Sequence, residues 1–268
     1  MYYRPGKLTE ALELKAQLGP KGVLLAGGTD LLAGIAKGRM DVRHWIDLSR
    51  LEELTVLQRE GKIWRIGASC THARLETLPI LAIAQAARAI GSPQIRNRGT
   101  VGGNLGTASP AGDLSVALLA CAAAVELLSC RGARRVELSE FFLAPGRTMM
   151  APDELIVAVY VPEILASDFR KLGKRQAVAI SVVCAAVARL ATGAVLVSLG
   201  SVAPTPLRAK SSEDFLAKHG LSASNNAQAA QLVSAEVQPI DDQRASAAYR
   251  RAMSGVLTRR LLDQLLEK

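Results

Sequence analysis

The stretch Thr100–Asp113 constrains the fold and function of this chain more than any other part of the sequence. Its fourteen residues include four glycines, three hydroxyl side chains, one amide and one carboxylate, but only two large apolar residues. Glycine lets the backbone adopt conformations that other residues avoid, and it lets another group approach the main chain closely. The stretch therefore predicts a loop whose backbone N–H groups bind an anion such as phosphate. An ordinary surface turn is the alternative interpretation.

A second stretch of the same kind, Ala26–Asp30, follows the apolar run Val23–Leu25 and precedes residues that favour a helix from Leu31. This order of strand, glycine-rich loop and helix is typical of phosphate binding. Hydrogen bonds to a charged group contribute about 1.5–3 kcal/mol each, so two such loops suit a diphosphate better than a single phosphate. We therefore expect a dinucleotide ligand.

The familiar nucleotide-binding signatures are absent from the sequence. A Rossmann fingerprint requires G-x-G-x-x-G after the first strand and an acidic residue about 20 positions later, and neither glycine-rich stretch has this spacing. The chain also lacks the G-x-x-x-x-G-K-[ST] sequence of P-loop nucleotidases. An ordinary Rossmann or P-loop site is therefore not expected.

The composition narrows the class of protein. The chain has 268 residues, enough for about two domains, with 49% hydrophobic and 21% charged residues, as in globular proteins. Aromatic residues make up only 4%, which argues against single-stranded nucleic-acid binding because that function relies on base stacking. The net charge of +9 comes from scattered basic residues, so we interpret it as a contribution to solubility or to a docking surface rather than as a nucleic-acid site.

Cysteine spacing and apolar runs exclude further classes. Cys70, Cys121, Cys130 and Cys184 show no C-x-x-C spacing, so neither a zinc site nor an iron–sulfur cluster is expected in this chain. We expect them to be buried free thiols in a reducing compartment. The N-terminus lacks the apolar core of a signal peptide, and the longest apolar run, 114–125, is too short to cross a bilayer. We therefore expect a cytoplasmic protein without a membrane span.

Hydrophobic spacing and turn residues predict the order of helices and strands. Thr9 is expected to cap a helix that ends at Leu18, and the following strand, helix and strand (23–25, from 31, and 44–48) predict a small sheet with parallel neighbours. Pro93 is expected to end a helix at 80–90 and to lead into the glycine-rich loop at 100–113. The patterns also predict a helical stretch from 71 to Pro79, a helix at 113–120 capped by Asp113, and strands at 54–57, 62–67, 125–129, 134–138 and 155–161.

The C-terminal part is expected to begin after a boundary near 163–168. The runs 177–190 and 194–201 predict two strands joined by a hairpin turn at Thr192-Gly193. From Lys210 onwards the sequence is helical in character, and we expect the last helix, 242–267, to pack on its own domain rather than on lipid. Its predicted apolar stripe comprises Ala245, Tyr249, Met253, Val256, Leu261 and Leu265.

Two pairs of polar residues raise the question of direct chemistry. Cys70 and His72 could form a thiol–imidazole pair, but no third member is placed beside them, so a nucleophile is not favoured. Asp30 and Asp113 could be a catalytic carboxylate pair. We favour instead a role for each in fixing its own glycine-rich loop, and then in contacting the ribose or adenine side of a nucleotide.

Several separated motifs together resemble one protein family. They are Ala26–Asp30, Ile66–Ala68, Gln94–Asn104 with Ala108–Pro110 and Asp113, Phe141–Thr148, Asp153–Leu155 and Gly200–Pro206. In this order they are similar to the FAD-binding medium subunit of the molybdenum hydroxylases, the family of bacterial xanthine dehydrogenase and aerobic carbon monoxide dehydrogenase flavoproteins. The resemblance covers nearly the whole chain.

The resemblance implies an α+β fold with two domains. Residues 1–165 would form a two-subdomain FAD-binding domain of the vanillyl-alcohol-oxidase (PCMH) type, with subdomains at about 1–52 and 53–165. Residues 166–268 would form a smaller C-terminal α+β domain of the carbon monoxide dehydrogenase flavoprotein type, in which helices pack on an antiparallel sheet.

The resemblance also implies an oxidoreductase subunit that does not turn over substrate alone. A large subunit would bind molybdopterin, a small subunit would bind 2Fe-2S clusters, and the complex would be a dimer of heterotrimers. Electrons would pass from the clusters through non-covalently bound FAD in this chain to NAD, oxygen or a quinone. A flavin-free scaffold or assembly protein with the same fold is the alternative, although the intact glycines in both stretches argue against it.

The positions of the family motifs imply a set of cofactor-binding residues, with no catalytic residue and no metal ligand in this chain. The two glycine-rich stretches would hold the diphosphate, Leu155 and Ile156 would flank the adenine or the ring system, and Lys171 would lie near the flavin. Ile90 falls where the animal xanthine enzymes carry an aromatic residue over the isoalloxazine ring. The full set is Leu24, Leu25, Ala26, Gly27, Gly28, Thr29, Asp30, Leu31, Ile90, Thr100, Gly102, Gly103, Asn104, Thr107, Ser109, Asp113, Leu155, Ile156 and Lys171.

Overall fold

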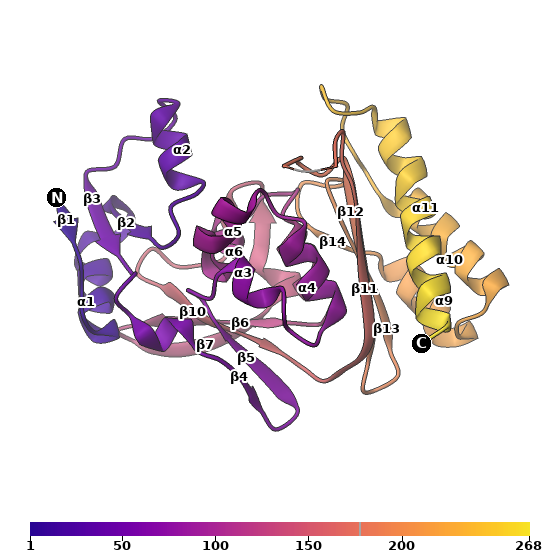
Figure 1. Cartoon of the computed structure of the whole chain (residues 1–268), viewed down its shortest axis with the longest axis horizontal. Helices are drawn as coiled ribbons and strands as arrows, with labels where there is room; N and C mark the ends of the chain where they lie inside the picture. The colour runs from indigo at the N-terminus through magenta and orange to yellow at the C-terminus, as the bar shows by residue number, and fades with distance from the viewer. Residues whose placement is uncertain (177) are drawn as a thin grey trace.

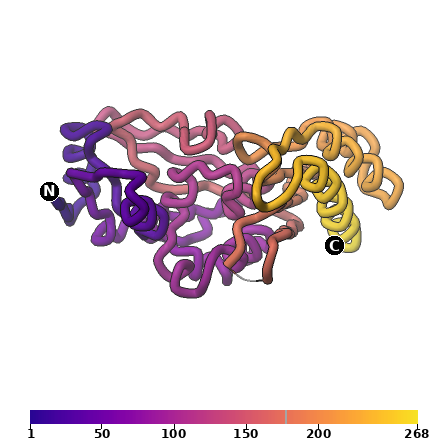
Figure 2. The backbone as a smooth tube through the Cα atoms, turned by 90° about the horizontal axis from the view of Figure 1, so that it is seen from above, coloured from indigo at the N-terminus to yellow at the C-terminus, as the bar shows by residue number. Residues whose placement is uncertain are grey.

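The computed structural model describes residues 1–176 and 178–268. The molecule is elongated, with the N-terminus at one end and the C-terminus at the other (Figures 1 and 2). A small N-terminal sheet, a larger central sheet with its helices, and a C-terminal sheet backed by three helices follow one another along its length. This mixture of sheets and helices confirms the α+β fold expected from the sequence.

The N-terminal unit is built around a three-stranded parallel sheet in the order β1-β3-β2, which confirms the expected strand–helix–strand arrangement. The first helix begins at Leu8, so the predicted cap at Thr9 is wrong. Glu10 accepts hydrogen bonds from the backbone nitrogens of Gly6 and Lys7 and thereby stabilises the earlier start. The elements are β1 (Tyr2–Tyr3), α1 (Leu8–Leu18), the 3-10 turn η1 (Gly19–Lys21), β2 (Gly22–Leu25), α2 (Leu31–Ala36) and β3 (His44–Asp47).

The central sheet has five antiparallel strands in the order β4-β5-β10-β6-β7. The strand predicted at 54–57 is wrong, because a 3-10 turn, η2 (Glu52–Thr55), precedes a strand that begins at Leu57. Leu54 is buried in this turn, so its apolar character reflects core packing rather than strand pairing. The strands are β4 (Leu57–Glu60), β5 (Ile63–Gly67), β6 (Ala124–Ser129), β7 (Gly132–Glu137) and β10 (Leu155–Val161), and β8 (Phe142–Ala144) pairs with β9 (Arg147–Thr148) in a separate hairpin.

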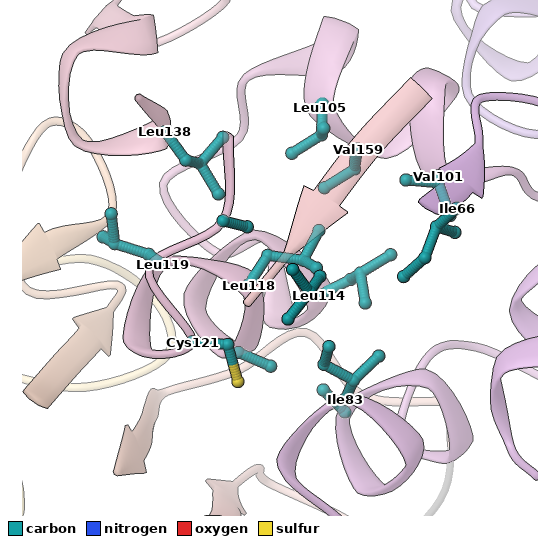
Figure 3. Packing of buried hydrophobic residues seen from close by; sticks show 14 of the residues in the cluster. Ile66, Ile83, Val101, Leu105, Leu114, Leu118, Leu119, Cys121, Leu138 and Val159 are labelled. Carbon is teal, nitrogen blue, oxygen red and sulfur yellow. The ribbon is translucent and has the colours of Figure 1, made fainter. Parts of the chain in front are cut away.

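Helices pack against this sheet and form the main hydrophobic core with it. In Figure 3, Leu114 and Leu118 lie between Ile83 and Val159 of β10, and all four side chains are fully buried. Burying side chains of this size contributes roughly 1.5–3 kcal/mol each. Gly112, and not Asp113 as predicted, is the N-cap of α7. The helices are α3 (His72–Leu75), α4 (Leu81–Arg88), α5 (Pro93–Arg98), α6 (Val101–Thr107), α7 (Asp113–Ala120) and α8 (Leu138–Phe141).

The C-terminal antiparallel sheet, in the order β11-β12-β13-β14, packs on both of its faces. In β12, Cys184 and Ala186 belong to the main core, whereas Val183 and Ala185 belong to a second core that includes the C-terminal helices. Successive residues of a strand point to opposite faces, so a sheet covered on both sides requires a continuous apolar run. The strands are β11 (Ile164–Leu172), β12 (Val183–Leu190), β13 (Val195–Gly200) and β14 (Leu207–Arg208).

The hairpin predicted at Thr192-Gly193 is confirmed, with Gly193 at a φ of 87°. The strand predicted over 177–190 begins only at Val183, and residue 177 lies outside the described residues. Strand β11 was not predicted, and it crosses the region 163–168 where a boundary was expected.

Three helices complete the chain: α9 (Lys210–His219), α10 (Ala223–Glu236) and α11 (Ala247–Leu266). The apolar stripe predicted on α11 is only partly correct. Leu261 and Leu265 are fully buried, but Tyr249 is 47% exposed and Val256 is 37% exposed. Arg250 is buried in their place, because its guanidinium group has two backbone carbonyl acceptors and a carboxylate partner.

The four cysteines are free thiols. Three of them are buried as expected, but the expectation is wrong for Cys130, which is exposed where β6 turns into β7. Within residues 1–176 and 178–268, no helix combines the length and the apolar character needed to span a bilayer.

Candidate functional site

Half of the stretch predicted as a glycine-rich loop forms the helix α6 (Val101–Thr107). Thr100 caps this helix, because its Oγ1 accepts a hydrogen bond of 3.1 Å from the backbone nitrogen of Gly103. Val101 and Leu105 point into the main core and anchor the helix there (Figure 3). Pro93, which was expected to lead into a loop, instead begins the preceding helix α5. The glycines of α6 therefore sit on a packed helix.

The backbone N–H groups in the first turn of α6 already have acceptors, so the expectation that they point freely at an anion is wrong. Val101 donates to the carbonyl oxygen of Cys70 at 3.0 Å, and Gly102 donates to that of Ala68 at 2.8 Å. The amides of the next two residues donate to the side chain and the carbonyl oxygen of the capping threonine. What α6 offers a ligand is close approach along its glycines, together with the threonine hydroxyl at its end.

The first glycine-rich segment, 26–30, has the free donors that α6 lacks. In the described part of the chain, the backbone nitrogens of Gly27, Gly28, Thr29 and Asp30 have no hydrogen-bond acceptor. Gly28 has a φ of 74°, a left-handed conformation that favours glycine. Such a bend with successive unpaired N–H groups is suited to binding an anion.

The two glycine-rich segments lie against each other. A Cβ on Gly27 would come 2.0 Å from the carbonyl oxygen of Arg98, so only glycine allows this contact between the loop and the end of α5. The hydroxyl of Thr107 at the end of α6 lies within hydrogen-bond distance of the Asp30 carboxylate, at 3.2 Å, and of the carbonyl oxygen of Gly103, at 2.8 Å. The sequence stretches predicted to act together are thus brought together, although 70 residues separate them.

A cavity of about 930 Å³ opens between these segments. Its volume lies near the upper end of the ~300–1,000 Å³ that small-molecule sites usually have, so it can accept a dinucleotide. Most of the predicted site residues line it: Leu24, Ala26, Gly27, Gly28, Thr29, Asp30, Leu31, Ile90, Thr100, Gly102, Gly103, Asn104, Thr107 and Ile156.

The other predicted residues, Leu25, Ser109, Asp113, Leu155 and Lys171, do not line this cavity. Leu155 is fully buried in the core beneath the N-terminal unit. Asp113 is also buried and pairs with Lys171 at 2.6 Å, so it does not accept hydrogen bonds from its own loop as favoured from the sequence. The lysine lies instead at a second, neighbouring cavity of about 540 Å³.

Three ionisable residues line the larger cavity without having been predicted there. Lys15 donates to the carbonyl oxygens of Gly19 and Gly22, and burial lowers the pKa of its ammonium group. Glu154 is held by a bidentate ion pair with Arg134, which lowers the pKa of its carboxyl group. The third is His72, which the sequence singled out only as a partner of a cysteine. Glu154 belongs to the motif Asp153–Leu155, but only Leu155 of that motif was assigned to the site. No local motif marks Lys15, which tertiary packing brings to the cavity.

The structure gives no support to a thiol–imidazole nucleophile. Cys70 Sγ lies 3.3 and 3.4 Å from two backbone carbonyl oxygens, and burial raises the pKa of its thiol. Burial and the nearby charge of Arg96 lower the pKa of His72 to about 4, so its imidazole is neutral near pH 7. No hydrogen bond joins the thiol to the imidazole within the described residues.

Comparison with known protein families gives two matches that together span almost the whole chain. Residues 1–164 match the FAD binding domain in molybdopterin dehydrogenase, and residues 168–265 match the C-terminal domain of the carbon monoxide dehydrogenase flavoprotein.

Individual proteins show the same similarity over nearly their full length. The carbon monoxide dehydrogenase medium chain of Hydrogenophaga pseudoflava is 32% identical over 98% of this chain and 95% of the relative. The xanthine dehydrogenase FAD-binding subunit of Escherichia coli is 32% identical over 98% of this chain and 94% of the relative. The solved structure of the Hydrogenophaga enzyme, in a form that lacks the Mo-pyranopterin moiety, superposes with a TM-score of 0.91 over 98% of this chain and 95% of that one.

Proposed function

Because the chain belongs to the FAD-binding subunits of the molybdenum hydroxylases, we propose that the cavity between its two glycine-rich segments holds FAD without a covalent bond. The chain is then the oxidoreductase subunit through which electrons leave the complex. When bound, FAD supplies one- and two-electron redox chemistry, whereas the protein contributes binding, orientation and electrostatics.

The free backbone N–H groups of segment 26–30 are the main donors that we propose for the diphosphate. Gly103 and Gly106 of α6 support this role, because a Cβ on Gly103 would meet only Thr100 Oγ1, at 3.0 Å, and a Cβ on Gly106 would meet nothing within 4 Å. The absence of side chains there leaves room for phosphate groups against the helix. Thr107, which also lines the cavity, completes the proposed contacts.

Apolar residues suit the part of the cavity where we propose that the ring system lies. Ile90 and Ile156 line it, and an aliphatic side chain at position 90 provides van der Waals contact but not the aromatic stacking expected of a phenylalanine or tyrosine. Lys171 donates to the carbonyl oxygen of Ala89 at 3.0 Å, next to Ile90. We therefore propose that Lys171 and Asp113 act at the ring end of the site by fixing this turn. Leu155 acts only through the core beneath the N-terminal unit.

The partners follow from the family. We propose that a large molybdopterin subunit and a small 2Fe-2S subunit assemble with this chain as a dimer of heterotrimers, and that the final electron acceptor is NAD, oxygen or a quinone. We also propose that the chain divides into residues 1–165 and 166–268 and that the protein is cytoplasmic. A flavin-free scaffold remains the second candidate function.

The proposal rests mainly on the close contact of Gly27 with the end of α5. Through this contact, the unpaired N–H groups of segment 26–30 and the glycines of α6 line the same cavity. The test is the visible absorption spectrum of the purified full chain, recorded before and after FAD is added and the excess is removed. One flavin per chain is the expected result. If no flavin bands remain after incubation with FAD, the scaffold function is favoured.

Substitution tests whether the cavity is the flavin site. In Gly103→Val, the added side chain occupies the space against α6, and we expect the flavin to be lost while the circular dichroism spectrum is kept. Gly6→Val is the matched control, because Gly6 has nothing within 4 Å of an added Cβ and lies outside the cavity. Stoichiometric flavin in Gly103→Val would show that the phosphates bind elsewhere.

A further inference from the structure

His72 lies where the two glycine-rich segments meet. It begins α3, lines the larger cavity, and is only 3% exposed. A Cβ on Gly99 would come 2.8 Å from Cδ2 and 3.1 Å from Nε2 of this imidazole. A Cβ on Gly27 would in turn come 3.0 Å from the Cα atom of Gly99. The imidazole, Gly99 and Gly27 are therefore contiguous, and the ring lies close to the unpaired N–H groups of segment 26–30.

The two ring nitrogens of His72 have different surroundings. Nδ1 is fully buried and has no hydrogen-bond partner. Nε2 lies on the ring edge that faces Gly99, and within residues 1–176 and 178–268 it also has no partner. A buried N–H without an acceptor is rarer in proteins than a buried acceptor without a donor, which favours the tautomer with the hydrogen on Nε2. The neutral imidazole then presents one N–H group at the cavity.

The imidazole of His72 is neutral and can still donate one hydrogen bond. Burial and Arg96 keep the imidazole neutral at physiological pH, and Arg96 is itself paired with Glu76 at 2.6 Å. A neutral imidazole carries one N–H donor, and a phosphate oxygen is a charged acceptor, for which a hydrogen bond is stronger than for a neutral one.

We infer that His72 donates a hydrogen bond from Nε2 to a diphosphate oxygen of the bound dinucleotide. This N–H group would supplement the backbone N–H groups of segment 26–30 as a phosphate donor. An additional donor is needed because the first-turn N–H groups of α6 already have other acceptors. This inference rests on the proposed function and assigns a cofactor-binding role to a side chain.

The test compares three substitutions in the full chain. His72→Phe keeps the shape of the ring without the donor, His72→Asn places an amide nitrogen near the position of Nδ1, and His72→Gln places one near the position of Nε2. His219→Phe is the control, because this histidine is exposed at the end of α9, away from the cavity. Dissociation constants are measured by calorimetry for FAD, for ADP, which carries the adenosine and the diphosphate, and for riboflavin, which carries the ring and the ribityl chain but no phosphate.

We expect His72→Phe and His72→Asn to bind FAD and ADP about 10- to 100-fold more weakly than the wild type, as loss of a hydrogen bond to a charged group implies. Binding of riboflavin should stay unchanged, and His72→Gln should recover most of the affinity for FAD. The apo form of His72→Phe should melt at the same temperature as the wild type or higher, because a buried nitrogen without a partner is removed. A purely structural histidine predicts a lower melting temperature instead.

Two results would overturn the inference and can be told apart. If the wild type binds FAD and His72→Phe binds it within about twofold as well, the histidine is not a donor to the cofactor, but the proposed function stands. Equal weakening of riboflavin and FAD, with ADP unaffected, would place the donor at the ring and would equally refute a diphosphate contact. If the wild type binds neither FAD nor ADP, the proposed function fails and the inference fails with it.

Discussion

Glycines around the cavity serve different purposes, and their local geometry separates them. Gly27 lies against the main chain at the end of α5, Gly28 has a left-handed φ, and Gly102 packs on Ala68. Gly106, by contrast, has open space where a Cβ would be. Substitution of the first three strains the fold, whereas substitution of Gly106 mainly changes the shape of the cavity.

Gly106→Ala should therefore separate stability from binding. Alanine favours a helix over glycine by about 0.8–1.0 kcal/mol, so the free energy of unfolding of the apo chain should rise. The added methyl group faces the cavity and should weaken FAD binding about tenfold. Urea unfolding and FAD titration measure the two effects. Gly34→Ala in α2 is the control, because it improves a helix without lining the cavity; a drop in stability of Gly106→Ala would contradict the assigned geometry.

The buried imidazole of His72 should make the chain sensitive to acid. Its pKa is about 4 in the folded chain and near 6.5 in an unfolded chain. Between these values the unfolded state binds more protons, so the free energy of unfolding should fall as the pH is lowered from 6.5 towards 4. His72→Phe should lose this part of the pH dependence, while other groups continue to titrate in both proteins. Urea unfolding at several pH values measures the difference, and parallel curves for the two proteins would contradict it.

At the scale of helices and strands, the burial of a side chain depends on its hydrogen-bond and ion-pair partners as well as on its apolar character. On α11, Arg250 is buried because it has carbonyl and carboxylate partners, whereas Tyr249 and Val256 remain exposed. A helical stripe of apolar residues predicts one face of a helix, but it does not predict which polar residues join that face.

Two substitutions on this helix test the assignment. Leu261→Ala removes a fully buried side chain and should lower the free energy of unfolding by about 2–5 kcal/mol. Val256→Ala changes an exposed position on the same helix and should alter it by no more than about 0.5 kcal/mol. Thermal or urea unfolding of the two variants provides the comparison. Similar losses in both would mean that α11 is rotated relative to the structure described.

The sequence predicts elements well where a local pattern determines them, as for β2 with its glycine bend and for β10. The sequence does not predict elements whose structure depends on contacts with residues far away in the chain. The acceptors for the first turn of α6 belong to Ala68 and Cys70, more than thirty positions earlier, so a free phosphate loop and a capped helix look alike in sequence. Strand β11 was missed because Ser167 and Asp168 make it polar, and their partners lie in α4 and at Lys268.

In the candidate site, too, the features set by local sequence could be predicted and those set by distant contacts could not. The glycine segments could be identified from their composition, and the structure brings most of the expected residues to one cavity. The position of Lys15 could not be foreseen, because it depends on how the N-terminal unit packs on the central sheet. Glu154 belongs to the motif Asp153–Leu155, but Leu155 was assigned to the site in its place. Asp113 also looked like part of a loop, although its partner, Lys171, belongs to the missed strand β11.

At the scale of the whole molecule, the two expected domains share a core. Cys184, Ala186 and Phe169 of the C-terminal sheet pack in the same cluster as Ile83 and Leu118 of the central region. Hydrogen bonds cross the junction as well, including one from Ser198 to the carbonyl oxygen of Val116. The C-terminal sheet is thus one wall of the core that supports the cavity.

A chain truncated to residues 1–165 should therefore not fold stably alone. Removal of the C-terminal sheet exposes the apolar faces of α4 and α7, which favours aggregation. Size-exclusion chromatography and thermal unfolding compare the truncated chain with the full one. A monomeric fragment with a cooperative transition near that of the full chain would show that the two domains are independent.

The central claim is that the cavity between segment 26–30 and α6 holds the diphosphate of FAD, and the structure of the full chain with FAD bound tests it most directly. The account predicts diphosphate oxygens about 3 Å from the backbone nitrogens of segment 26–30, beside Gly103 and Gly106. A diphosphate bound elsewhere, for example at the second cavity beside Lys171, would contradict it.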